Sequence, residues 1–189
     1  MLSVPRPTFT EGDYAKARRK YRPARIRILF VAESPPSSGG YFYFPKTVGK
    51  DHLFRETMKA LRFWPRDRPM GRGIDKRPFL ERFCARGFFL IDTCPLPVDK
   101  LPTKTRANAI GEGALTIASR VRQLNPGNVV VIKKTIFHPV SDSLVQAGLG
   151  NKILNKKPLP FPSHGNQQSF RNQLTRLIAS QNMVNRLAQ

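Results

Sequence analysis

Residues 25–45 read R-I-R-I-L-F-V-A-E-S-P-P-S-S-G-G-Y-F-Y-F-P and contain an apolar run at residues 28–31. A short run of this kind, with β-branched and aromatic members, is typical of a strand that is buried on both faces. The run is followed by Glu33 and Ser34, and two prolines then stiffen the chain because each fixes its φ angle. Open α/β sheets bind their ligands at the carboxyl ends of their strands. These residues therefore predict a central strand followed by a candidate binding loop.

Aromatic residues follow this loop, after a glycine pair that allows a tight turn. The four consecutive aromatics are Tyr41, Phe42, Tyr43 and Phe44. Together with a carboxylate on a rigid loop, they indicate a pocket for a flat ring. The alternative is that the prolines only turn the chain and that the aromatics only cap the core.

Charge is the most informative feature of the composition. The 189-residue chain carries 33 Lys and Arg against 12 Asp and Glu, which gives a formal net charge of +21. Asp142 is the only acidic residue after Glu112. A charge of this size favours binding to a polyanion, of which nucleic acid is the first candidate and an anionic membrane surface the second. A soluble basic protein without such a partner is the remaining alternative.

The length of the chain fits a single domain with a full hydrophobic core. The two cysteines, Cys84 and Cys94, are too few for a disulfide framework or for a zinc or iron–sulfur site made of cysteines alone. Their scarcity fits a reducing, intracellular compartment. No apolar stretch approaches the length of a membrane span, and we expect neither a signal peptide nor a membrane partner.

Strand-like and helix-like patterns alternate along the chain. We expect strands at residues 28–31, 88–91, 128–132 and 157–162, the last one weakened by Pro158 and Pro160. We expect helices at residues 10–20, from 51 to 61, from 78 to 87, at 106–124 and 141–147, and from Asn166 or Ser169 onward. This alternation predicts a three-layer α/β/α sandwich with a central four-stranded parallel sheet. Residues 1–24 are expected to form an arm and a short helix, and residues 25–189 a single domain.

Three loops leave the carboxyl ends of the expected strands and carry polar residues. They are residues 32–36, 92–97 and 161–166. Because the carboxyl ends of parallel strands lie on one edge of a sheet, we expect Glu33, Asp92 and His164 to share a cleft. Taken singly, Asp92 could cap a turn and His164 could be an ordinary loop histidine, since polar residues are common in turns.

The three loops, in this order and spacing, resemble the motifs of the uracil-DNA glycosylase superfamily. The first motif of that family is a strand followed by G-x-x-P-x, and residues 32–36 read A-E-S-P-P. In the single-strand-selective branch the second motif is similar to N-x-C-P-L, and residues 92–96 read D-T-C-P-L. The last motif is H-P-S, and residues 161–164 read F-P-S-H. The resemblance extends from about Arg25 to the last helix.

This resemblance implies a monofunctional DNA glycosylase of base excision repair. Such an enzyme flips uracil, or a related deaminated base, out of DNA and hydrolyses its N-glycosidic bond, which leaves an abasic site. The reaction passes through an oxocarbenium-like sugar, and it needs a positioned water and stabilisation of the leaving base. The expected partner is uracil-containing DNA. We expect a monomer without cofactor, metal or iron–sulfur cluster, located in the cytoplasm with the nucleoid of a bacterial-type cell.

The same resemblance assigns roles to individual residues. The catalytic candidates are Glu33, Ser34, Asp51, Asp92 and His164. The base-binding candidates are Tyr43, Phe44, Asp92 and Phe161, of which Phe44 is expected to stack on the ring. For DNA contact the resemblance gives Ser163, Gly165, Gln167 and Gln168, and the positive charge beside the expected cleft adds Lys133, Lys134 and Arg171. Gln167 or Gln168 is expected to fill the gap left by the flipped base.

The chain departs from the family at several of these positions. Ser34 stands where the best-known branch has the aspartate that positions water, and Phe161 stands at the motif histidine. Asp92 replaces the asparagine that reads the base. A carboxylate can accept the N3–H of uracil, but it can donate to O4 only when it is protonated. Asp51 is a weaker candidate for positioning the water, with a helix N-cap as the alternative role.

Two other functions remain open. A catalytically silent relative would bind DNA without cleaving the glycosidic bond. A small-molecule α/β enzyme, such as a nucleotide hydrolase, is disfavoured because the sequence has neither a Walker-type loop nor a dinucleotide glycine fingerprint. Such an enzyme would also leave the large positive charge without a reason.

Overall fold

The computed structural model describes residues 9–187, with side chains described as far as residue 181. Its strands are β1 (Ile28–Ala32), β2 (Phe88–Asp92) and β3 (Asn128–Val131). Its helices are α1 (Glu11–Arg19), α2 (His52–Ala60), α3 (Arg77–Ala85), α4 (Thr103–Leu124), α5 (Lys134–Gln146) and α6 (Gln167–Leu187), with short 3-10 turns η1 (Val48–Lys50) and η2 (Gly150–Lys152).

The sheet is parallel and has the order β2-β1-β3. Its register pairs Ile28 with both Phe88 and Asn128, so the three strands end at the same edge. Every residue of β1 and β2 is buried, as expected for apolar strands covered on both faces. The predicted parallel α/β architecture is therefore confirmed, and β1 is its central strand.

The expected fourth strand at residues 157–162 is not formed. Leu159 makes only an isolated parallel bridge to Ile132. Prolines lack a backbone N–H and are excluded from sheet interiors, which explains why this proline-rich segment does not pair further. The outer side of β3 is hydrogen-bonded to the buried side chain of Asn155 instead. Its Oδ1 accepts from the Val131 N–H, and its Nδ2 donates to the Val131 carbonyl, both at 3.0 Å.

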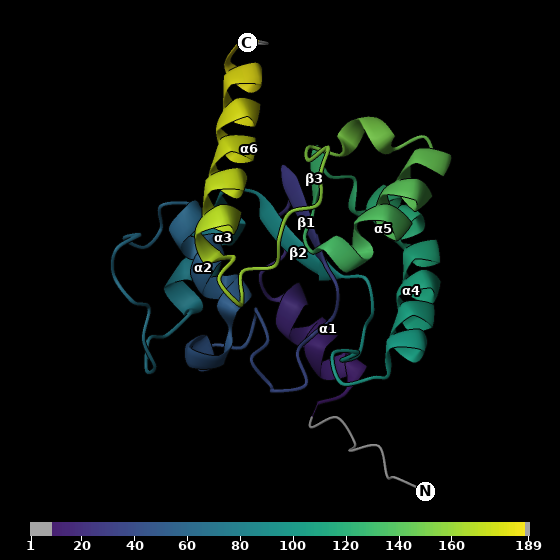
Figure 1. The fold of residues 1–189 in the computed structure, drawn as a ribbon. Helices are drawn as coiled ribbons and strands as arrows, with labels where there is room; N and C mark the ends of the chain where they lie inside the picture. The colour runs from purple at the N-terminus through teal and green to yellow at the C-terminus, as the bar shows by residue number, and fades with distance from the viewer. Residues whose placement is uncertain (1–8, 188–189) are drawn as a thin grey trace, which may run out of the picture.

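Helices flank the strands on both sides. Figure 1 shows α2, α3 and α6 on one side of the sheet and α4 and α5 on the other. Within these groups α2 contacts α6, and α4 contacts α5. Among the described residues, none of the helices combines the length and the apolar character that crossing a bilayer requires.

Two helix starts differ from the sequence expectation. The helix expected at 106–124 begins three residues earlier, at Thr103. The helix expected at 141–147 begins at Lys134 and runs through Pro139. A proline inside a helix removes one hydrogen bond. Burial of Ile136 and Val140 against the core outweighs that loss, because tertiary packing commonly overrides helix propensity.

The N-terminal helix is part of the core. Thr10 and Asp13 form the capping box that begins α1. Tyr14 is buried, with its ring edge-on to Tyr41 at 4.9 Å and stacked near Phe44 at 5.6 Å. Residues 1–8 of the predicted arm lie outside the described residues.

Candidate active site

A cleft of about 570 Å³ lies at the carboxyl edge of the sheet, and we call it the strand-end cleft. The loops after β1 and β2, the start of α5 and the loop after Leu159 all contribute to its wall. Of the residues predicted from sequence, it brings together Glu33, Ser34, Asp51, Asp92, Lys133, Phe161, Ser163 and His164. The expectation that Glu33, Asp92 and His164 share one cleft is therefore confirmed.

Glu33 is a buried carboxylate held by three side chains. Lys133 Nζ lies 2.8 Å from Oε1, Arg106 donates to the same oxygen, and the hydroxyl of Thr135 donates to Oε2. Burial raises the pKa of Glu33, but the bonds from Lys133, Thr135 and Arg106 lower it more, so the net shift is downward. Glu33 therefore stays ionised, and the cluster of Glu33, Lys133 and Arg106 has a net positive charge.

Lys133 lines the cleft and has an unusual backbone conformation. Its φ is +93°, a region in which L residues are strained and glycine is not. Its Nζ lies 5.2 Å from the centre of the Phe161 ring as well as against Glu33. Lys134 is exposed at the first position of α5. The two lysines predicted to act alike on DNA thus have different surroundings.

Asp92 is the last residue of β2, and only 2% of its surface is exposed. The Tyr41 hydroxyl donates to its carboxylate at 3.3 Å, and Arg18 Nη1 lies 3.7 Å away. Burial raises the pKa of Asp92 to about 6, because Arg18 and Tyr41 offset only part of the desolvation. If Asp92 capped a turn, its carboxylate would accept from the backbone N–H of Cys94, two residues on. That N–H bonds instead to the Glu33 carbonyl at 2.8 Å, so the capping alternative for Asp92 is wrong.

Asp51 has both carboxylate oxygens engaged. Oδ1 accepts from the Phe54 N–H at 2.9 Å and caps α2, as the alternative role expected, while Oδ2 lies 2.6 Å from the amine of Lys76. Lys76 is completely buried and also donates to the Tyr41 carbonyl at 2.8 Å and to the Thr47 hydroxyl at 3.0 Å. Lys76 thus joins a cleft residue to the segment that carries the aromatics.

The aromatic residues are distributed differently from the expectation. Tyr43 is buried away from the cleft, and its hydroxyl accepts from the Leu90 N–H at 2.8 Å and donates to the Leu90 carbonyl at 3.1 Å. Phe44 packs under α1 against Tyr14, with ring centres 5.6 Å apart. Neither residue lines the cleft, whereas Tyr41, Phe42 and Phe161 do.

The last loop carries the rim of the cleft. His164 is exposed with a φ of +49°, and its Nδ1 lies 2.9 Å from the Ser163 hydroxyl. Gly165, Gln167 and Gln168 follow it at the start of α6 and do not line the cleft. Arg171 binds the buried carboxylate of Glu56 on α2, so this predicted DNA contact joins two helices.

Sequence reasoning gave no site role to several residues of the cleft. They are Lys50, His52, Asp99 and Thr135. Asp99 accepts from the Ser37 N–H at 3.0 Å and from its hydroxyl at 2.7 Å, which links the loops after β1 and β2. Arg106 also lines the cleft, and the sequence did indicate it, because it ends a basic segment at residues 100–106 that is expected to contact DNA beside the cleft.

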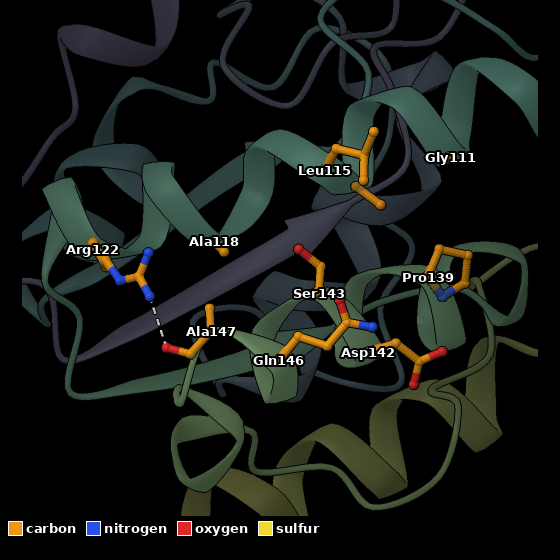
Figure 2. A pocket seen from close by; sticks show the side chains of 10 residues that line it. Gly111, Leu115, Ala118, Arg122, Pro139, Asp142, Ser143, Gln146 and Ala147 are labelled. Carbon is orange, nitrogen blue, oxygen red and sulfur yellow. Dashed lines mark hydrogen bonds between the residues drawn. The ribbon is translucent and has the colours of Figure 1, made fainter.

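A separate cavity of about 540 Å³ lies between α4 and α5 (Figure 2). Its wall consists of small residues with Leu115, Arg122 and Asp142, and it shares no residue with the strand-end cleft.

Within the described part of the chain, no group of three or more His, Cys, Asp or Glu side chains is placed to hold a metal ion. No protein-family model matches this sequence, and no curated protein matches it.

Proposed function

We propose that the protein is a DNA glycosylase that flips uracil, or a related deaminated base, out of DNA and hydrolyses its N-glycosidic bond. The observation that carries the proposal is the buried Asp92 at a strand end, in a cleft that also holds Glu33, Phe161 and His164. The net charge of +21 supports DNA as the partner. We further propose that the protein acts as a monomer in the cytoplasm, with the nucleoid.

The position of residues 157–162 supports the likeness to the uracil-DNA glycosylase superfamily. Leu159 bridges to the end of β3, at the place of a fourth strand. The loop that follows therefore reaches the strand-end cleft with Phe161, Ser163 and His164, in the chain order that the family motifs predict.

In this mechanism Asp92 reads the edge of the flipped base. Ionised, its carboxylate accepts the N3–H of uracil; protonated, it donates to O4. A pKa of about 6 makes both forms accessible near neutral pH. Phe161 replaces Phe44 as the stacking ring, because it lines the cleft and Phe44 does not.

The positive cluster around Glu33 stabilises the charge that develops on the leaving base. Lys133 and Arg106 carry two positive charges against the one negative charge of Glu33. Their site is partly buried, so the remaining positive charge attracts a developing anion more strongly than it would in water. Because the carboxylates of Glu33 and Asp51 are engaged, Ser34 and the exposed His164 are the residues proposed to position the water.

A uracil-containing oligonucleotide tests the proposal directly. We expect alkali-labile strand breakage after incubation, in single-stranded or duplex DNA, and loss of at least an order of magnitude in single-turnover rate in Asp92→Ala. Asp92→Asn should keep or improve excision, since an amide serves both N3–H and O4. No breakage with the wild-type protein would refute the glycosylase.

One observation favours a second candidate, a relative that binds DNA without cleaving it. The carboxylate oxygens of Glu33 and Asp51 all accept hydrogen bonds from the protein itself. Both carboxylates are therefore held by the protein instead of being free to activate a water beside the sugar. A salt-sensitive gel shift with intact glycosidic bonds would establish this binder.

A further inference from the structure

A second cavity, of about 280 Å³, lies between α1, α4 and the edge strand β2, and it shares no lining residue with the strand-end cleft. Its floor is apolar and includes the buried side chains of Phe89 and Ile91. Four arginines line it: Arg18, Arg19, Arg22 and Arg120. We call this space the arginine cavity. Because α1 and α4 are far apart in the sequence, the fold itself brings these four charges together.

These arginines have few partners in the protein. Arg19 and Arg22 have no side-chain hydrogen bond or ion pair within the described part of the chain, and Arg120 makes one long bond, of 3.5 Å, to the Thr93 carbonyl. Arg18 donates to the Tyr41 hydroxyl at 3.3 Å and lies 3.7 Å from Asp92. Among the described residues, Asp92 is the only carboxylate within ion-pair distance of these four guanidinium groups.

The surroundings do not neutralise this charge. Burial and the neighbouring Arg18 lower the pKa of Arg120, although Asp92 and Glu11 act in the opposite direction. The cavity lies beside the C-terminal ends of α1 and α4, which supply about half a negative charge each. Four positive charges against two carboxylates and two helix ends leave a net positive site.

The side chains that line the arginine cavity indicate which kind of ligand it binds. Guanidinium groups bind phosphate oxygens through paired, charge-assisted hydrogen bonds. The volume lies below the range of pockets that enclose drug-sized molecules, so it suits a small ion better than a whole nucleotide. The apolar floor strengthens attraction, because the effective dielectric constant is lower there than in water. We propose that the arginine cavity binds a phosphate group.

Inorganic pyrophosphate is the probe for this site. The full chain is titrated with pyrophosphate by calorimetry, at an ionic strength held constant with sodium chloride so that general screening does not change. We expect saturable binding by the wild type, together with a rise in melting temperature. Arg120→Gln should weaken binding by about tenfold or more, since a charge-assisted contact is lost. Arg22→Gln is the second variant, because Arg22 is exposed and its replacement leaves the core intact.

Arg122→Gln is the matched control. Arg122 is on the same helix, two residues further on, and donates to the Ala147 carbonyl at 2.8 Å in the other cavity (Figure 2). The control variant loses the same charge as Arg120→Gln, but Arg122 does not line the arginine cavity. We therefore expect it to bind pyrophosphate like the wild type. If the wild type does not bind, or if Arg120→Gln and Arg22→Gln both bind as tightly as Arg122→Gln, the proposed site does not exist.

The phosphate could belong to a DNA backbone or to a free phosphate compound. A short oligonucleotide without uracil separates these sources by competition against bound pyrophosphate. If the oligonucleotide displaces pyrophosphate from the wild type and Arg22→Gln weakens this displacement, the site binds a DNA phosphate. If the oligonucleotide leaves pyrophosphate binding unchanged, the site binds a free phosphate compound. Either result supports the site, and neither depends on base excision.

Discussion

At the scale of single residues, the protonation of Asp92 links stability to pH. Burial raises its pKa from 3.8 to about 6, so the folded chain holds this proton more tightly than the unfolded chain. The contribution of Asp92 to stability is fully present below pH 3.8 and is lost as the pH rises through about 6. The total loss is about 3 kcal/mol.

Asp92→Asn should remove this loss, because an amide does not titrate. We expect the free energy of unfolding of the variant, relative to the wild type, to rise between about pH 4 and pH 7 and then to level off. Urea denaturation at a series of pH values measures this difference. A difference that stays constant with pH would show that Asp92 does not carry the raised pKa.

Lys133 and Lys134 offer a matched pair of neighbouring residues. If Lys133 stabilises the leaving base, Lys133→Gln should slow excision of uracil by about tenfold or more and that of 5-fluorouracil less, because the fluorinated base is the more stable anion. The exposed Lys134 should affect both bases equally, through DNA affinity. Single-turnover excision rates measure this difference, with two duplexes of the same sequence that contain either uracil or 5-fluorouracil. An equal loss for the two bases in Lys133→Gln would assign Lys133 to DNA binding.

Phe161 and Phe44 separate stacking from packing. Phe161→Ala should slow excision while the melting temperature changes little, since base stacking on an aromatic contributes about 1–3 kcal/mol. Phe44→Ala should mainly lower stability, because this ring packs against Tyr14 and Phe9. Rates and melting curves of both variants are the measurement. Slower excision by Phe44→Ala at unchanged stability would restore Phe44 as the stacking ring.

At the scale of elements, one buried ion pair connects the start of α2 to the aromatic segment. Lys76→Met leaves Asp51 as an uncompensated buried charge, so we expect a loss of about 3–5 kcal/mol in the free energy of unfolding. In the double variant Lys76→Met with Asp51→Asn, the amide still caps α2 without a charge, and part of the loss should be recovered. Urea denaturation of both variants decides, and a double variant that is less stable than Lys76→Met would contradict the ion-pair explanation.

The outer side of β3 shows how one side chain substitutes for a strand. Asn155 accepts from and donates to the backbone of Val131, where the proline-rich segment cannot pair. The bridge at Leu159 is enough to direct the following loop to the strand-end cleft. Lys133, the residue before α5, lies at the same place, with its N–H bonded to the Leu159 carbonyl at 2.9 Å.

At the scale of the whole molecule, the charge of +21 predicts how DNA binding depends on salt. Each phosphate that the protein neutralises releases counterions, so six contacts would lower affinity roughly a thousandfold between 50 and 200 mM salt. Gel shifts of one duplex over this range measure the slope, and an unrelated duplex should give a similar slope. Affinity that does not change with salt would exclude the phosphate contacts.

Three strands of the sheet, and the edge at which polar residues gather, were predictable from the sequence, whereas the expected fourth strand is not formed. The strands at residues 28–31, 88–91 and 128–132 were predictable because buried parallel strands are short apolar runs, a local property of the chain. The meeting of Glu33, Asp92 and His164 followed from topology, since parallel strands end at one edge.

The side chains that face the cleft, and their partners there, were not predictable from local sequence patterns. Glu33 binds Arg106 and Lys133, 73 and 100 residues further along the chain, and no local pattern encodes such contacts. The aromatic segment divides because α1 packs on Phe44 and β2 binds the Tyr43 hydroxyl, which leaves Tyr41 and Phe42 to line the cleft. Periodicity indicates that a residue is buried, whereas the neighbour against which it is buried depends on how distant elements pack.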